Sequence, residues 1–322
     1  MAKIETARGP VDSATLGVTL MHEHVFVLDA EIMQNSPEEW GSEEKRVAAA
    51  IDRLNELKAR GVDSIVDLTV IGLGRYVPRI ERIAAQTRLN ILVATGLYTY
   101  SELPFYFQFR NPEAMTEMFV RDIEQGIPGT NVRAAVLKCS TDSPGLTRGV
   151  ERLLRATAMA HRQTGVPIST HTNARRRNGL DQQRIFREEG VDLTRVVIGH
   201  CGDTTDLAYL EELMGNGSYI GMDRFGLDSF CPFDDRVATV ATLCDRGYAD
   251  QMVLSHDAAC FNHWLPEGSI EETMPRWNYL HIHNDVIPAL LKKGVTEEQL
   301  RTMLVDNPRR IFEKASQLGS LR

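Results

Sequence analysis

Two histidines near the N-terminus, His22 and His24, lie one residue apart within the apolar stretch Leu20–Val27. Aliphatic and aromatic residues of this kind favour a β-strand, in which alternate side chains point to the same face. His22 and His24 should therefore share one face, and Glu23 should point to the other. Two imidazoles on one face can bind the same metal ion, although a single His-x-His pair can also be purely structural.

Other residues with metal-binding chemistry stand at the ends of later apolar stretches: Lys138, His171, His200 and Asp257. If these stretches are parallel strands of one barrel, their carboxyl ends meet on one face, which is where barrel enzymes build their active sites. The sequence therefore predicts a metal site made from four histidines, one aspartate and one buried lysine.

The number of ligands indicates more than one ion. Imidazole and carboxylate groups suit zinc and other first-row divalent cations, and five of them exceed what one catalytic zinc usually takes. Two neighbouring ions would use all five if an anionic group bridged them. Lys138 is unexpected beside cations, because an ammonium group would be repelled. It must be neutral, turned away, or converted chemically into an anion.

The segments that carry these residues alternate between strand and helix. One example is the predicted helix over 42–61, which has Val47, Ile51, Leu54 and Leu57 at helical spacing and is followed by a strand. The predicted strands cover residues 20–27, 62–69, 90–98, 132–139, 166–172, 195–201, 218–225 and 251–257. Apolar strands separated by helices indicate a parallel sheet covered by helices. Eight such units predict an α/β fold, a closed (β/α)8 TIM barrel. A doubly wound open sheet is the alternative, but its phosphate-binding glycine motifs are absent.

Composition and length agree with one hydrolase barrel domain spanning residues 1–322, with 43% hydrophobic and 25% charged residues. A net charge of −8 argues against a nucleic-acid partner. No apolar run is long enough to cross a membrane and no signal peptide is evident, so we expect no membrane partner and a cytoplasmic location. Five cysteines without CxxC spacing argue against a disulfide framework.

Six short segments, taken together, are highly specific: Met21-His22-Glu23-His24, Val136-Leu137-Lys138, Ser169-Thr170-His171-Thr172, Ile198–Asp203, Gly221–Phe225 and Leu254–Asp257. Through them the chain resembles the phosphotriesterase-like lactonases of the amidohydrolase superfamily, over essentially its whole length. The resemblance implies that Lys138 is N-carboxylated and bridges two divalent metal ions. It assigns His22, His24 and Asp257 to the more buried ion and His171 and His200 to the more exposed one. Zinc is favoured, with cobalt, iron or manganese as alternatives.

The same resemblance places Tyr98 and Arg224 at the ends of strands three and seven, near the reacting group. It implies hydrolysis of lactones, above all N-acyl-homoserine lactones, by a metal-bridging hydroxide, with Asp257 as proton acceptor and weaker phosphotriesterase activity. The enzymatic alternatives are a dedicated phosphotriesterase or another ester or amide hydrolase. The non-enzymatic alternative is a metal-bound ligand-binding protein. We also expect a homodimer, on the resemblance alone.

The substrate pocket is expected to include two aromatic groups, the run Phe105-Tyr106-Phe107 and Trp264, which offer apolar surface for an acyl chain. Trp264 belongs to an irregular stretch, 258–279, whose length is typical of a lid or binding loop. Lactonases of this group often have cysteine two residues after the strand-eight aspartate, where this chain has Ala259 followed by Cys260. We expect the smaller side chain to widen the pocket floor.

Overall fold

The computed structural model describes residues 2–319, with side chains to residue 313. Its main feature is a curled sheet with purely parallel pairing, in the order β10-β9-β8-β7-β6-β5-β4-β3-β11. The strands are β3 (Thr19–Val27), β4 (Ser64–Asp67), β5 (Asn90–Gly96), β6 (Val136–Ser140), β7 (Ile168–His171), β8 (Val196–Ile198), β9 (Tyr219–Met222), β10 (Met252–Leu254) and β11 (Ala259–Asn262). The predicted TIM-barrel fold is confirmed, and each predicted strand is present; β3 begins one residue earlier than predicted, and the other seven are shorter.

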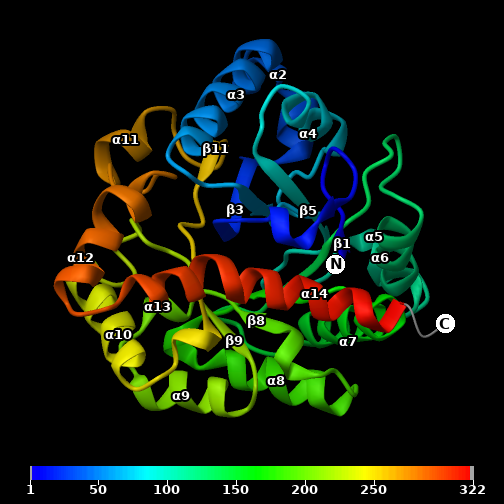
Figure 1. Ribbon diagram of the computed structural model, residues 1–322. Helices are drawn as coiled ribbons and strands as arrows, with labels where there is room; N and C mark the ends of the chain where they lie inside the picture. Colours follow the sequence, from blue (N-terminus) through cyan, green and yellow to red (C-terminus); the bar gives the residue numbers. More distant parts are fainter. Residues whose placement is uncertain (1, 320–322) are drawn as a thin grey trace.

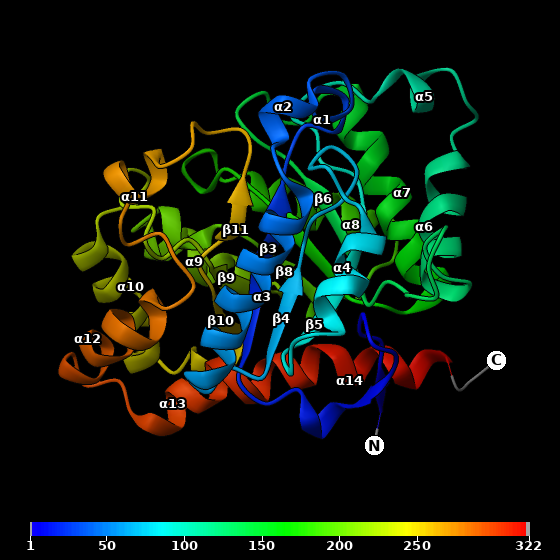
Figure 2. The same ribbon diagram turned by 90° about the horizontal axis from the view of Figure 1, so that it is seen from above.

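Helices surround the sheet on its outside (Figure 1). They are α3 (Glu43–Ala59), α4 (Val77–Ala84), α6 (Ala114–Glu124), α7 (Arg148–Thr164), α8 (Asn178–Glu188), α9 (Leu207–Gly215), α10 (Phe233–Asp245), α12 (Ile287–Lys292) and α13 (Glu297–Arg301). The helix α14 (Asn307–Gly319) runs across the end where the strands begin, and the short α1 (Ala30–Asn35), α2 (Pro37–Trp40) and α5 (Phe105–Gln108) lie at the opposite end (Figure 2). No helix among residues 2–319 is long and apolar enough to cross a membrane.

Local sequence explains why α3 forms where it does. The Ser42 side chain accepts a hydrogen bond from the Lys45 amide, and Glu43 and Glu44 occupy the first turn, where the helix dipole favours negative charge. One stripe of the helix, which includes Leu54 and Leu57, is completely buried against the barrel. Burial of each leucine contributes roughly 1.5–3 kcal/mol, so packing of this stripe anchors the helix.

The barrel closes through an additional strand, β11, that the sequence did not predict. Residues 258–279, expected to be irregular, contain β11 and the helix α11 (Ser269–Thr273), and β11 pairs with β3. Between β10 and β11, the Asp257 amide donates to the His22 carbonyl at 3.0 Å, and the His24 amide donates to the Ala258 carbonyl at 2.9 Å. The chain therefore crosses the seam, where the end of β10 meets β3, and continues as β11 alongside β3.

Glu23 stabilises this seam from outside the barrel interior, as strand alternation predicts. Its fully buried carboxylate accepts hydrogen bonds from Ser255 Oγ (2.8 Å), the His256 amide (3.0 Å) and the Ala258 amide (2.9 Å). His256 Nδ1 lies 2.7 Å from the same carboxylate, and its Nε2 accepts from the Ile282 amide at 3.0 Å. His256 is thus a structural residue held away from the predicted metal cluster.

One glycine allows close contact beside Lys138. Gly96 pairs with Lys138 across β5 and β6 and has φ +142°, and a Cβ atom there would lie 1.9 Å from the Lys138 carbonyl oxygen. No other residue fits such a position without displacing a backbone. Glycine at this point keeps the strand that carries Lys138 in place.

Candidate metal centre

The six residues predicted to bind metal come together at the carboxyl ends of the strands. His22 and His24 lie on β3, Lys138 on β6 and His171 on β7, while His200 and Asp257 follow β8 and β10. The closest approaches are Lys138 Nζ to His22 Nε2 (2.9 Å), His24 Nε2 to Asp257 Oδ1 (3.1 Å), His22 Nε2 to Asp257 Oδ1 (3.4 Å), His171 Nδ1 to His200 Nε2 (2.8 Å) and His200 Nε2 to Asp257 Oδ2 (3.8 Å). Among the described residues, His22, His24 and Asp257 form one group whose ligand atoms all lie within 4.8 Å of one another.

Asp223 orients two of the imidazoles from behind. Its Oδ2 lies 2.9 Å from His22 Nδ1, and its Oδ1 lies 3.0 Å from His200 Nδ1 and accepts from the His200 amide at 2.8 Å. Because both Nδ1 atoms are occupied, both Nε2 atoms face the centre. Asp223 also forms a potential ligand group with His22 and His200. We regard it as an outer partner, since its oxygens already bond to the far nitrogens of both rings.

The other two imidazoles are held in the same way. His24 Nδ1 lies 2.9 Å from Thr69 Oγ1, whose hydroxyl donates to Asp67 at 2.5 Å, so the imidazole is the donor to Thr69. His171 Nε2 lies 2.7 Å from Asp142 Oδ2 and presents Nδ1 to the centre. Each imidazole therefore has one anchored nitrogen and one nitrogen facing the cluster, which is typical of metal-ligating histidines.

The contact between His171 and His200 indicates that the cluster can hold a cation. His171 donates from Nε2 to Asp142, and His200 donates from Nδ1 to Asp223. In their neutral forms the two nitrogens that face each other at 2.8 Å are therefore both acceptors. Two lone pairs at this distance repel each other unless a positive charge lies between them. The donor set fits a divalent metal ion.

Burial keeps these groups in the protonation states that a metal requires. Burial lowers the pKa of His22 and of His200 well below the ordinary value, and that of His171 to about 4. Burial acts to raise the pKa of Asp257, but His22 and Arg224 more than offset it and leave that pKa well below its ordinary value. The site thus presents neutral imidazoles and an ionised carboxylate, the forms that bind metal.

Lys138 is 1% exposed and has a perturbed pKa. Burial lowers the pKa of its amine to about 8, although the Asp257 carboxylate acts in the opposite direction. A lysine with this pKa has an appreciable neutral fraction near neutral pH, whereas an exposed lysine has almost none. This is the first of the three predicted states, a neutral amine, and it is also the form that can react with carbon dioxide.

Two of the cluster residues have a left-handed backbone. His200 has φ +59° and Asp257 has φ +56°, a conformation that non-glycine residues seldom adopt. His200 lies two residues after the end of β8 and Asp257 three residues after the end of β10, where a left-handed residue can turn the side chain into the barrel mouth. Such strain persists where surrounding structure holds it, and it is concentrated at functional sites.

Tyr98 and Arg224 both border the cluster. The Tyr98 hydroxyl lies 2.6 Å from the Tyr100 hydroxyl, and burial raises the Tyr98 pKa well above its ordinary value. Arg224 donates from Nε to Asp257 Oδ2 at 2.9 Å and from Nη1 to Asp203 Oδ2 at 3.0 Å. Sequence reasoning missed the roles of Tyr100, Asp203 and Asp223, although both aspartates stand in the specific segments.

A cavity of about 270 Å³ opens above the cluster. Besides the cluster, its lining is mainly apolar and includes Leu73, Leu227, Phe230, Trp264, Leu265, Met274 and Trp277. Trp264 therefore lies where the sequence predicted. The fully buried His200 and Lys138 form its floor, so a ligand in this cavity would meet the cluster directly.

The other residues that were predicted to line the substrate pocket lie outside this cavity. Phe105, Tyr106 and Phe107 lie on α5 and do not line this cavity; Phe107 is buried in the core, while Phe105 is 73% exposed and stacks on Phe109. The reason is that α5 turns outward and packs only one of its aromatic rings inward. Ala259 and Cys260 instead border a separate cavity beside α3, because β11 carries them past the barrel mouth. They cannot widen the floor of the cavity above the cluster.

Comparisons with known proteins identify the family of this chain. The family model described as "Phosphotriesterase family" matches residues 2–312. The "Phosphotriesterase homology protein" of Mycobacterium tuberculosis is 68% identical over 321 residues, covering 98% of each chain. The "Aryldialkylphosphatase" of Saccharolobus solfataricus is 40% identical over 305 residues, covering 94% of this chain and 96% of the relative. A solved structure, "Structure of the phosphotriesterase from Mycobacterium tuberculosis", has a TM-score of 0.96 at 68% identity and covers 97% of this chain and 98% of that one. This chain belongs to the phosphotriesterase family of binuclear metal-dependent hydrolases.

Proposed function

We propose that the protein is a lactonase that hydrolyses N-acyl-homoserine lactones and has weaker phosphotriesterase activity. One observation carries this proposal: the cavity directly above the cluster is walled by apolar side chains, including Leu227, Phe230, Trp264 and Trp277. An acyl chain gains about 0.8 kcal/mol for each methylene that it buries. A compact phosphotriester has no tail with which to use this surface.

The geometry of the cluster supports the proposed metal-holding roles. His22, His24 and Asp257 would hold one ion, and His171 and His200 would hold the other. Lys138 lies beside His22 Nε2, and its lowered pKa favours the neutral amine that carboxylation requires. As an N-carboxylated lysine it would supply the anionic bridge. Bound divalent ions, with zinc favoured, would polarise the substrate carbonyl and lower the pKa of a bound water.

Asp257 is the proposed proton carrier. Arg224 holds Oδ2 at 2.9 Å, and the low pKa of the carboxylate keeps it ionised. It takes a proton from the attacking water and passes it to the alkoxide oxygen when the ring C–O bond breaks, so that one water and one lactone give one hydroxy acid. The Tyr98 hydroxyl stays protonated because burial raises its pKa, and it can donate to a substrate oxygen.

A dedicated phosphotriesterase is the second candidate, favoured by the names of two relatives. A tetrahedral phosphorus centre resembles the tetrahedral intermediate of lactone hydrolysis, so one site can act on both. Amide hydrolysis is supported by the "N-acetyltaurine hydrolase" of Xenopus tropicalis, 27% identical over 344 residues and covering 95% of this chain and 97% of the relative. However, the lysine and arginine side chains among the described residues that line the cavity are Lys138, which is proposed to be carboxylated, and Arg224, which is already paired with Asp257 and Asp203. Neither of these side chains is left unpaired to bind the sulfonate of N-acetyltaurine.

The test is a comparison of kcat/KM on metal-loaded protein for homoserine lactones of increasing acyl length, for paraoxon and for N-acetyltaurine. Two extra buried methylenes should raise kcat/KM by roughly tenfold, since about 1.4 kcal/mol corresponds to one factor of ten. A rate that is flat across the lactone series, or that is highest for paraoxon, would favour the phosphotriesterase candidate.

A further inference from the structure

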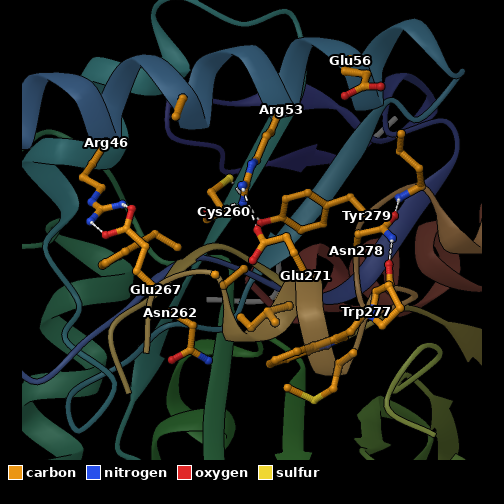
Figure 3. A pocket seen from close by; sticks show the side chains of 18 of the residues that line it. Arg46, Arg53, Glu56, Cys260, Asn262, Glu267, Glu271, Trp277, Asn278 and Tyr279 are labelled. Carbon is orange, nitrogen blue, oxygen red and sulfur yellow. Dashed lines mark hydrogen bonds and ion pairs between the residues drawn. The ribbon is translucent and has the colours of Figure 1, made fainter. Parts of the chain in front are cut away.

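A second, larger cavity of about 550 Å³ lies between α3 and the segment 259–284 (Figure 3). One helical stripe of α3 forms its outer wall: Arg46, Ala49, Arg53 and Glu56, spaced three or four residues apart. This is a different face of α3 from the stripe with Leu54 that packs on the barrel. Its volume falls in the range of small-molecule sites, about 300–1,000 Å³.

Small residues keep this space open. Ala49 sits at the centre of the α3 stripe and carries only a methyl group, and a Cβ atom on Gly268 would meet no atom within 4 Å. The apolar part of the wall around them includes Phe261, Ile270 and Leu280. The cavity therefore exists because small residues border it, and a larger side chain at position 49 would fill it.

The charges in the cavity neutralise one another. Arg46 donates two hydrogen bonds to Glu267, at 3.2 and 3.0 Å, and its guanidinium lies 3.8 Å from the centre of the Phe261 ring. Arg53 donates to the Cys260 carbonyl, and its Nη2 lies 3.6 Å from Glu271. Figure 3 shows Arg46 extending from α3 toward Glu267, and Arg53 toward Glu271.

These contacts define the chemistry of an occupant. The two pairs leave no net positive charge, and the Glu56 carboxylate at the edge disfavours an anion. At 3.6 Å the Arg53 to Glu271 contact is too long for a good hydrogen bond, so Nη2 remains available as a donor. The cavity suits an uncharged, mainly apolar molecule with one acceptor oxygen.

Three side chains, Asn262, Met274 and Trp277, border both this cavity and the cavity above the metal cluster. Trp277 is fixed, because its indole nitrogen donates to the His256 carbonyl at 3.0 Å. Met274 is unbranched and adapts its shape easily. A molecule bound in the second cavity would therefore contact the same three side chains that a substrate contacts from the other side.

We propose that the cavity between α3 and segment 259–284 is a second binding site, for an uncharged, mainly apolar small molecule whose acceptor oxygen bonds to Arg53. Its body lies against Phe261, Ile270 and Trp277. This site is separate from the metal centre, and its existence does not depend on which substrate the metal centre hydrolyses.

The probe for the test is prodan, an uncharged naphthyl ketone whose fluorescence changes in apolar surroundings. Titration of the metal-loaded protein should show that one prodan molecule binds per chain. Ala49→Trp and Ile270→Trp should each abolish this binding, because the two substitutions fill the cavity from opposite walls. Ala48→Trp is the matched control, since Ala48 is exposed on α3 and does not line the cavity. It should bind prodan as the wild type does. Arg53→Met should weaken this site about tenfold, through loss of one hydrogen bond to a charged donor.

Thermal denaturation shows whether each variant is folded, and a prodan-soaked crystal locates the probe directly. Electron density between α3 and Trp277 is the expected result. Density only above the metal centre, no binding to the wild type, or unchanged stoichiometry in both folded filling variants would each overturn the proposal.

Discussion

The amine of Lys138 lies 2.9 Å from Nε2 of His22, and both side chains are almost completely excluded from solvent. This pair joins β6 to β3 across the barrel mouth. A positively charged amine beside metal ligands would oppose cation binding, whereas a carboxylated amine would add an anionic ligand. The state of Lys138 is therefore central to the proposed centre.

Lys138→Ala should remove the bridging group. We expect metal content to fall from two divalent ions per chain and activity to fall by at least 10²-fold, because removal of a key electrostatic group costs a factor of this order. Elemental analysis and kcat/KM measure the two effects, and added bicarbonate or short carboxylic acids should restore part of the activity. Full activity with two bound ions in the Ala variant would exclude the bridging role.

Asp223→Asn should weaken metal binding without removing a direct ligand. Asp223 orients His22 and His200 together, and loss of such an outer partner typically lowers metal affinity 10–100-fold. Competition with a chelator measures the change. Asp228→Asn is the control, because Asp228 pairs with Arg276 outside the cluster. Equal metal affinity in both variants would contradict the assigned role.

The metal-free protein should lose stability as the pH falls from 7.5 to 5.5. Burial lowers the pKa of His22, His171 and His200, so the unfolded chain binds more protons than the folded chain below the ordinary pKa near 6.5. Their contribution is fully present above that value and decreases below it. Burial raises the pKa of Asp223 to about 7 and also raises the pKa of Asp67 and of Asp203, which acts in the opposite direction. Burial also lowers the pKa of three further histidines, His161, His281 and His283, which adds to the effect of the cluster.

Urea denaturation at both pH values, after metal removal, measures this effect. The decrease in the free energy of unfolding should be on the order of 1 kcal/mol or more, and saturating zinc should offset it by binding only the folded state. A metal-free protein that is equally stable or more stable at pH 5.5 would mean that the imidazoles are not held neutral.

Trp264→Ala should lower kcat/KM for a long-chain lactone by about tenfold or more and have a smaller effect on paraoxon, because Trp264 borders the cavity and offers surface to the tail. Phe105→Ala is a matched control that should change neither, since Phe105 is exposed on α5. Asp257→Asn should suppress both activities. If Trp264→Ala lowers both activities equally, the apolar-tail argument is wrong.

We expect the chain to form a homodimer, and α5 offers a candidate surface. Phe105 and Phe109 are 73% and 83% exposed, and their rings stack at 6.0 Å. Sedimentation should give twice the chain mass of 36.1 kDa. The double variant Phe105→Ser, Phe109→Ser should dissociate more readily if this surface is the interface. A wild-type mass near that of one chain would contradict the dimer.

Several features of the site follow from rules of local structure that can be applied to a sequence. Strand alternation places His22 and His24 on one face with Glu23 opposite, and the structure has this arrangement. The repeated strand and helix pattern predicts a parallel barrel, and in a parallel barrel the strand ends meet. These two rules bring Lys138, His171 and His200 together without any knowledge of side-chain packing.

The sequence by itself therefore determined the fold, the cluster residues and the end of the barrel where they meet, because strand periodicity and the direction of parallel strands are local properties. Only the tertiary structure decided which residues surround them. Asp223 reaches two imidazoles from another strand, and Asp257 enters the site through a left-handed turn at the seam with β3. Phe105 and Trp264 are both aromatic residues in segments that follow barrel strands, yet only Trp264 borders the cavity above the cluster. Loop direction depends on packing between distant segments, and local residue preference does not encode it.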